Sequence, residues 1–162
     1  MIELQIGWEG RSALDFSRVY ATTAAIDDFR PVLAQIASGV IGPSVATNFV
    51  SGGRPGWNEL AASTLAAKAV KGQSSRILVA DGALERAAGN AANYKITKDE
   101  LRAAPFGIDY WVYHQSGTPR MPQRVIMMLQ AEDRTAIFAL FAAYMRTFID
   151  FGARQFTGGL RS

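Results

Sequence analysis

Large apolar residues recur at helical spacing near the end of the chain. Such a stripe lies along one face of an α-helix, and burying its side chains stabilises a fold by ~1.5–3 kcal/mol each. The pattern predicts a long amphipathic helix packed on the core, followed from about Gly152 by a flexible arm that carries Arg154 and Arg161. The members of the stripe are Ile137, Leu140, Phe141, Tyr144, Phe148 and Phe151.

A second apolar stripe occupies the region after Asp27 and Asp28, which are a plausible helix start with Pro31 in the first turn. Proline removes a helical hydrogen bond, so Gly42-Pro43 should bend or interrupt this helix. The stripe consists of Val32, Leu33, Ile36, Val40 and Ile41, and then Val45 and Phe49.

Shorter elements fill the rest of the chain. Ile2 to Ile6 alternates apolar and polar residues as a half-buried strand does, and 93–97 with 102–109 reads as a strand hairpin around residues 98–100. A short helix should run from about Leu60 to Gly72, and Asp81 should cap another. The expected fold is α+β in one domain over 1–162: a small antiparallel sheet packed by an N-terminal helical region and the long C-terminal helix.

Composition excludes several classes of site. The chain has 162 residues, no cysteine and one histidine, which removes disulfides, cysteine-based zinc sites and a cysteine nucleophile. We expect no cofactor and no metal. A net charge of +3 is too small to indicate a nucleic-acid partner. No apolar run reaches membrane-spanning length and no signal peptide is recognisable, so we expect synthesis in the cytoplasm and no membrane partner.

The single histidine, His114, is interpreted as structural. A catalytic base requires an orienting partner and usually a nucleophile, and neither a Ser-His-acid order nor a Gly-x-Ser-x-Gly motif is recognisable. The glycine pairs at 52–53 and 158–159 lack the residues that complete a phosphate-binding loop. We therefore expect no enzymatic activity.

Aromatic and basic residues leave alternatives open. Trp57, Trp111 and Tyr113 could stack on nucleic-acid bases, but residues of this kind belong more often to a core or an interface. Arg120 and Arg124 could hold phosphate, although a solvated turn or an interface salt bridge is favoured.

Two stretches in order resemble the phage virion morphogenesis family, which includes the Mu-like and P2-like tail completion proteins. One is Trp57-x-x-Leu60-x-x-x-Thr64-x-x-x-Lys68, after Phe49 and Pro55. The other is Tyr110-x-x-x-His114-Gln115-x-Gly117, followed by Pro122-x-Arg124 and an apolar run read as a strand. Between them, 78–84 resembles a Leu-x-x-Thr-Gly-x-Leu turn of the family. The resemblance extends from about Phe29 to Phe148.

The chain departs from the family pattern at several positions. Asp81 stands where threonine is usual, and both residues cap helices. Ala87 replaces a frequent serine, Trp111 a common alanine, and Val125-Ile126 a frequent Pro-Phe. These departures indicate a distant member.

The resemblance implies a structural protein of a tailed bacteriophage virion: a tail completion or terminator ring at the head–tail neck that closes the tail and joins it to the capsid. Its expected partners are other copies of itself in a homo-oligomeric ring, expected to be a hexamer, together with the tail tube protein and the head-side neck or connector proteins. DNA would only pass through the lumen. A head-side connector or other assembly component of the same fold is the alternative, and a small nucleic-acid-binding domain is a distant one.

A ring needs two different complementary faces on each subunit. The candidate surfaces are the glycine-rich loop at 51–56, an apolar strand edge after Pro122, and the basic arm. The candidate interface residues are Arg54, Trp57, Thr118, Arg120, Arg124 and Arg154.

Overall fold

The computed structural model describes residues 28–158, and the strand expected over 2–6 lies outside the described residues. The described chain is α+β, as predicted, with a two-stranded antiparallel sheet and a long C-terminal helix. In chain order the elements are α2 (Arg30–Ile36), η1 (Ala37–Ile41), α3 (Gly42–Ser51), α4 (Ala62–Val70), α5 (Ala83–Gly89), η2 (Ala91–Asn93), β1 (Lys95–Ile96), β2 (Leu101–Arg102), α6 (Trp111–Ser116) and α7 (Ala131–Gly158).

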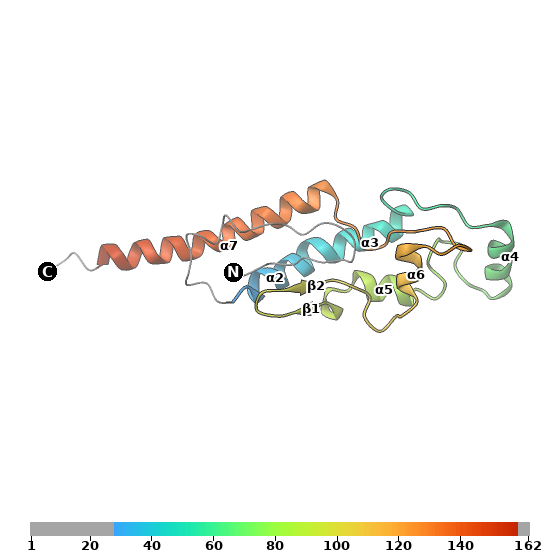
Figure 1. Ribbon diagram of the computed structural model, residues 1–162, viewed down its shortest axis with the longest axis horizontal. Coiled ribbons are helices and arrows are strands. Elements are labelled where there is room, and N and C mark those ends of the chain that lie inside the picture. The colour runs from blue at the N-terminus through green and yellow to red at the C-terminus, as the bar shows by residue number, and fades with distance from the viewer. Residues whose placement is uncertain (1–27, 159–162) are drawn as a thin grey trace.

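A central helical run, α2–η1–α3, lies between α7 on one side and the hairpin with α5 on the other (Figure 1). The predicted start is confirmed: Pro31 lies in the first turn, and the Asp28 carboxylate accepts the Arg30 backbone N–H at 3.0 Å. Hydrogen bonds from the Arg30 guanidinium, and then this backbone bond, lower the pKa of Asp28 to about 2. The predicted interruption is also confirmed. A π-helical turn, η1, ends at Ile41, just before Gly42-Pro43. Proline has no backbone N–H to donate, and the wider turn accommodates this missing hydrogen bond.

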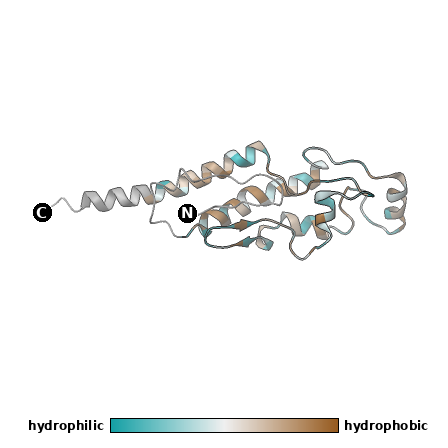
Figure 2. Ribbon diagram, viewed as in Figure 1, coloured by the Kyte–Doolittle hydropathy of each residue, from teal (hydrophilic) through white to brown (hydrophobic). Residues whose placement is uncertain are grey.

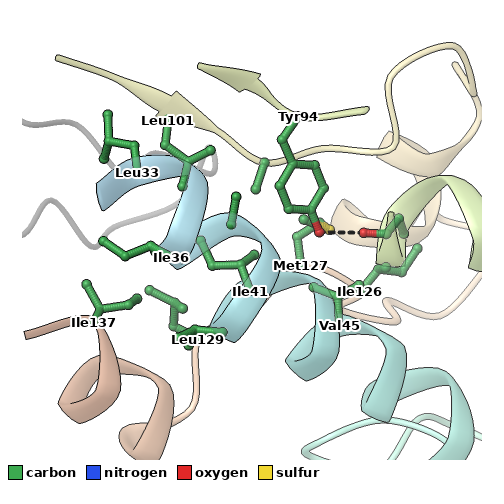
Figure 3. Packing of buried hydrophobic residues seen from close by; sticks show 14 of the residues in the cluster. Leu33, Ile36, Ile41, Val45, Tyr94, Leu101, Ile126, Met127, Leu129 and Ile137 are labelled. Carbon is green, nitrogen blue, oxygen red and sulfur yellow. Dashed lines mark hydrogen bonds between the residues drawn. The ribbon is translucent and has the colours of Figure 1, made fainter. Parts of the chain in front are cut away.

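The core forms where the apolar face of this run meets the other elements. Figure 3 shows side chains of the run, from Leu33 to Val45, facing residues of β2, of the segment before α7, and of α7 itself. Tyr94 closes one side of this core and donates its hydroxyl to the Ala88 carbonyl at 2.6 Å, and burial raises the pKa of Tyr94 to about 12. The central run and the first half of α7, whose ribbons carry many hydrophobic residues (Figure 2), therefore contribute their buried side chains to one core.

The long C-terminal helix packs its first half on the core, as its stripe predicted. Ile137, Phe141 and Met145 are buried, and the Phe141 ring stacks on Phe29 at 5.5 Å between centroids. The Tyr144 hydroxyl donates to the Asp28 carbonyl at 2.6 Å. The predicted end near Gly152 is wrong, because the backbone stays helical to Gly158. One glycine costs a helix only ~1 kcal/mol, and the residues after it carry no proline.

The predicted hairpin exists but is shorter than expected. Lys95 pairs with Arg102 and Ile96 with Leu101, around the turn at 98–100. The second strand ends at Arg102, well before Pro105, and 103–105 is buried without pairing in the sheet. The turn is fastened to α2, since the Phe29 N–H donates to the Lys98 carbonyl at 2.7 Å.

Close packing between α3 and α5 depends on small residues. A Cβ added at Gly42 would lie 2.9 Å from the Gly89 carbonyl oxygen, and one at Gly89 would touch Ala46 at 3.4 Å. Glycine at these two positions lets the helices approach closely, which fixes α5 and the turn before it against the core.

One helical span of the described chain, Arg30–Ser51, is long and apolar enough to cross a membrane by length and hydropathy, and 61 % of its most apolar window is buried within the protein. A core helix of a globular domain has the same properties.

We expect Phe141→Ala to lower the free energy of unfolding by ~3–5 kcal/mol, because it leaves a cavity against Phe29. Phe148→Ala is the matched control on the same helix: Phe148 is 39 % exposed and should contribute much less. Urea denaturation of both variants measures the difference. Equal small losses would place the Phe141 position outside the cooperative core.

Candidate functional site

Residues 124–130, named here the core segment, join the turn after α6 to α7 without regular secondary structure. Ile126, Met127 and Leu129 within it are buried. The strand expected after Pro122 is therefore wrong, and its apolar residues form no exposed edge. Buried backbone groups need partners, and here side chains supply them in place of a neighbouring strand.

Gln115 of α6 is the main partner of the core segment. Its Oε1 accepts the backbone N–H groups of Ile126 at 2.8 Å and Met127 at 3.0 Å. Its Nε2 donates to the Met127 carbonyl at 3.0 Å. One amide thus satisfies three backbone groups, which explains why a glutamine stands at this position of the motif.

Two further side chains bind carbonyls of the core segment. Asn48 Nδ2 of α3 donates to Ile126 at 2.9 Å, and the Trp57 indole N–H donates to Val125 at 2.9 Å. Trp57 is 8 % exposed and packs edge to face on Phe49 at 5.5 Å. Of the alternatives for Trp57, the structure supports core packing.

The close approach of Trp57 requires glycine at position 53. Gly53 is buried with φ +101°, and a Cβ there would lie 2.5 Å from the indole ring. The loop at 51–56 is therefore partly packed inside the fold and is not a fully exposed surface.

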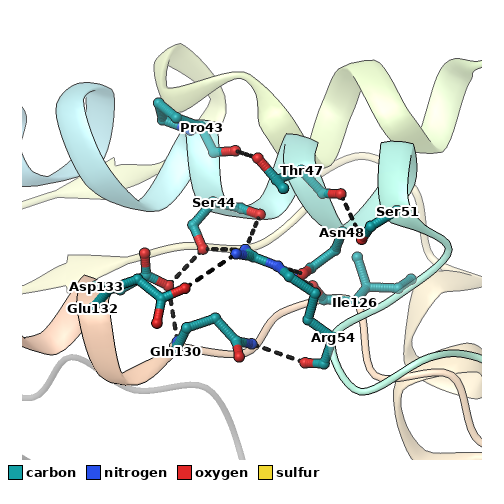
Figure 4. A network of polar contacts seen from close by, with 10 residues as sticks. All are labelled: Pro43, Ser44, Thr47, Asn48, Ser51, Arg54, Ile126, Gln130, Glu132 and Asp133. Carbon is teal, nitrogen blue, oxygen red and sulfur yellow. Dashed lines mark hydrogen bonds and ion pairs between the residues drawn. The ribbon is translucent and has the colours of Figure 1, made fainter.

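Arg54 ties this loop to α3 and to the start of α7 (Figure 4). Its guanidinium donates to Asn48 Oδ1 at 2.8 Å and to the carbonyl and hydroxyl of Ser44 at 2.7 Å each. It also lies 3.4 Å from Glu132, while the Arg54 carbonyl accepts Gln130 Nε2 at 2.8 Å. Ser44 in turn donates to Asp133, whose carboxylate also accepts the Gln130 backbone N–H.

Arg124 is buried, with 6 % exposure, and binds main-chain carbonyls. Its guanidinium donates to Asn58 at 3.0 and 3.1 Å and to Glu59 at 3.2 Å, and its backbone N–H donates to His114. Burial lowers the pKa of Arg124. The favoured interpretations of a solvated turn or an interface salt bridge are wrong for Arg124, and its donors are not directed at a phosphate site.

Gly117 ends α6 with φ +74° and ψ 171°, a conformation that only glycine adopts readily. A Cβ would lie 3.0 Å from the Gln123 backbone nitrogen. The glycine of the motif therefore lets the returning chain pass close to α6 and enter the core segment.

A cleft of about 780 Å³ opens between α4 on one side and α6 with the turn after it on the other. Leu60, Thr64 and Lys68, spaced by four residues, line the α4 side. Its other residues are Glu59, Ala61, Gln73, Leu78, Ala80, Asp81, Leu84, Tyr110, His114, Arg120, Met121, Pro122 and Arg124. The three stretches that carry the family resemblance thus meet around one cleft.

Lys68 and Asp81 form hydrogen bonds that fix the segments lining this cleft. Lys68 Nζ donates to the carbonyls of Arg76 and Val79 at 2.7 Å each, and burial lowers its pKa. The Asp81 carboxylate accepts the Ala83 N–H at 3.0 Å, so it caps α5 as predicted, and this bond lowers the pKa of Asp81.

His114 lies on the cleft wall with its ring 6.1 Å from Tyr110, edge to face. Its Nδ1 is buried without a hydrogen-bond partner among the described residues. Burial, and secondarily the positive charge of Arg124, lowers the pKa of His114. The His114 side chain forms no hydrogen bond to the backbone of residues 28–158, and it is the His114 backbone carbonyl that accepts the Arg124 N–H.

Among residues 28–158 no three His, Cys, Asp or Glu side chains gather in a way that could hold a metal ion. The side chains of Lys68, Asp81 and Arg124 at the cleft instead bind main-chain groups, an arrangement that holds segments together.

The six candidate interface residues divide into three groups. Arg54, Trp57 and Arg124 are used inside the chain. Thr118 and Arg120 are exposed on a turn closed by backbone bonds between Thr118 and Met121. The side chain of Arg154 lies outside the described residues. Neither α6 nor the role of Gln115 was predicted from the sequence. The His-Gln-x-Gly spacing was the signal that could have indicated them.

We expect Gln115→Ala to lower the free energy of unfolding by ~2–4 kcal/mol, since it leaves three partly buried backbone groups without partners. Gln115→Glu keeps the acceptor for Ile126 and Met127 but places a charged oxygen against the Met127 carbonyl, so it should also be strongly destabilising at neutral pH. Gln123→Ala is the control, because Gln123 is exposed and donates a single bond, to the Gln115 carbonyl. Chemical denaturation that ranks Gln123→Ala level with Gln115→Ala would contradict the assignment.

Stability should fall as pH drops below about 6.5, the usual pKa of histidine. Folding lowers the pKa of His114, so the unfolded chain binds a proton that the folded chain takes up only at lower pH. His114→Gln removes this contribution of histidine protonation to the pH dependence of stability. The test is to measure the unfolding free energy of both proteins at about pH 7.5 and about pH 5.5, where carboxylates remain mostly ionised. The decrease between the two pH values should be larger for the natural chain than for His114→Gln. Equal falls in both proteins would show that His114 is not the group responsible.

No protein-family model, curated protein or solved structure matches this chain. What can be said of function therefore rests on the motif residues and on the geometry around the cleft.

Proposed function

We propose that this chain is a structural protein of a tailed bacteriophage virion that acts as a tail completion or terminator ring at the head–tail neck. The supporting observation is the convergence of the motif stretches. Residues 57–68, 78–84 and 110–124 are distant in sequence, and their side chains line one cleft. Gln115, Gly117 and Arg124, which carry the resemblance, hold the backbone together there.

The chemistry of these side chains supports a structural role. Lys68 and Arg124 direct their donors at carbonyls of the same chain, and Gln115 uses both ends of its amide on the core segment. Side chains committed in this way fix the relative positions of α3, α4 and α6. They are not arranged to activate a substrate, so we propose no enzymatic activity.

Exposed residues of α6 and the turn after it supply a surface for assembly. Tyr110 and Tyr113 are 48 % and 57 % exposed, and Thr118 and Arg120 lie on the following turn. Tyrosine and arginine are enriched at protein interfaces. In the proposed hexameric ring this surface meets a neighbouring copy, the tail tube protein or a head-side neck protein. DNA passes through the lumen, and the subunits are made in the host cytoplasm.

A cryo-EM reconstruction of the virion neck tests the proposal. We expect a closed ring of this chain at the end of the tail, because a rotationally symmetric tube is matched by subunits that associate head to tail and close. A ring on the capsid side of the junction would favour the head-side connector. Single copies, or none at the junction, would refute the proposal.

A binding titration against duplex DNA over a range of salt concentrations addresses the nucleic-acid alternative. Tight binding with a steep salt dependence would favour a DNA-binding domain. The proposed ring predicts weak binding by the free chain, because its net charge is only +3.

A further inference from the structure

The cleft between α4 and α6 keeps polar side chains that the fold does not use. Its volume of about 780 Å³ lies within the ~300–1,000 Å³ range of ligand sites in proteins. Leu60, Leu84 and Met121 belong to its apolar lining. The lining side chains whose polar groups form no hydrogen bond or ion pair among residues 28–158 include those of Glu59, Thr64, Gln73, Tyr110 and Arg120. The cleft therefore offers both apolar surface and unused donors and acceptors.

The charges around the cleft leave it positive. Lys68 and Arg124 direct their donors at main-chain carbonyls, which do not cancel a positive charge. The negative charge of Asp81 is opposed by that of Arg86 nearby. The lining residues whose charges have no ion-pair partner or opposing neighbour in the described chain are Lys68, Arg120 and Arg124, which are cations, and Glu59. Three cations against one carboxylate favour an anionic occupant over a cationic one.

His114 registers this positive charge. Burial, and then the charge of Arg124, lowers the pKa of His114, so its imidazole is neutral at pH 7. A carboxylate bound in the cleft would act in the opposite direction, because a nearby negative charge favours the protonated ring. His114 lines the cleft and is the single histidine of the chain, so its titration reports on what the cleft binds.

Arg120 is the cation that remains available to bind an anionic group. It is exposed on the turn after α6, and its backbone N–H donates to Thr118 Oγ1 at 3.3 Å, whereas its guanidinium has no partner among residues 28–158. A guanidinium binds a carboxylate through two parallel hydrogen bonds. Because Arg120 shares the cleft with the apolar lining, a carboxylate bound there would have its apolar neighbours against that lining.

We propose that the cleft binds a segment of a partner protein in which a glutamate or aspartate is flanked by apolar residues. The carboxylate binds Arg120, the flanking residues pack on the apolar lining, and the hydroxyls of Thr64 and Tyr110 bind peptide groups. A peptide segment is favoured because Tyr110 both lines the cleft and belongs to the exposed surface proposed for assembly. The inference deepens the proposed function and rests on it for the partner being a virion protein.

Two blocked peptides, acetyl-Leu-Glu-Leu-amide and acetyl-Leu-Gln-Leu-amide, test the proposal with the full-length chain. They differ only in the carboxylate, and neither has a charged end. The pKa of His114 is measured by NMR with and without each peptide. The glutamate peptide should raise the pKa of His114, and the glutamine peptide should leave it unchanged. The glutamine peptide should also bind about fivefold more weakly, since the carboxylate is held by an exposed arginine.

Two arginine variants supply the matched comparison. Arg120→Gln and Arg134→Gln each remove one positive charge from an exposed side chain, but Arg134 lies on α7 and does not line the cleft. Arg120→Gln should abolish both the preference for the glutamate peptide and its effect on His114, and Arg134→Gln should keep both. Circular dichroism checks that both variants are folded. Equal loss in the two variants, or no loss in either, would overturn the proposed contact.

The remaining outcomes are also decisive. Equal binding of the two peptides with no change at His114 would reveal an apolar contact alone and overturn the role of the carboxylate. Sodium hexanoate that binds as tightly as the glutamate peptide would indicate a site for a free organic acid and overturn the peptide. Binding of neither peptide overturns the site itself. A neck ring without peptide binding would reject this inference alone, and peptide binding without a neck ring would reject the proposed function and leave the cleft as a peptide site.

Discussion

The fold depends on a buried backbone segment that has no strand beside it. Residues 124–130 cross the core in irregular conformation, and an unpaired buried N–H or C=O costs about 1–3 kcal/mol. Gln115, Asn48 and Trp57 supply the missing partners from three different elements. Because each partner must be held in place, the need to satisfy this segment fixes α3, α6 and the loop before α4 relative to one another. Arg54 also binds the Ser44 carbonyl of α3, and Arg124, the first residue of the segment, binds the Asn58 carbonyl before α4.

Much of the architecture followed from periodicity. The stripes of the central run and of α7 predicted two packed helices, and Phe141 meets Phe29 at the contact between them. Local chemistry was also sufficient at Pro31, at Pro43 and at Asp81, because the constraint in each case acts within one turn of the backbone. Periodicity failed where long-range bonds replace regular pairing. The run after Pro122 is apolar because it is buried, and nothing local distinguishes such a segment from a strand.

The candidate site was predicted less completely for the same reason. The motif pointed to His114, Gln115, Gly117 and Arg124, but spacing alone did not show that Gln115 bonds to residues eleven and twelve positions later. Arg124 and Trp57 were candidate interface residues, with a core position left open for Trp57, and both are buried with their donors on main-chain carbonyls. A buried position and a surface position for these two residues give similar local sequence patterns, and only the tertiary contacts distinguish them.

This packing makes the middle of the molecule different from its two ends. The network around Gln115 and Arg54 makes the middle of the molecule a rigid unit, because Gln115 binds α6 to the core segment and Arg54 binds the loop at 51–56 to α3 and to Gln130. α4 lies at one end with no buried side chain, and α7 continues past the core at the other. A rigid centre holds the two ends at a fixed distance and angle from each other. A subunit of fixed shape suits the proposed ring, because a ring of defined size closes only when successive copies associate at one repeated angle.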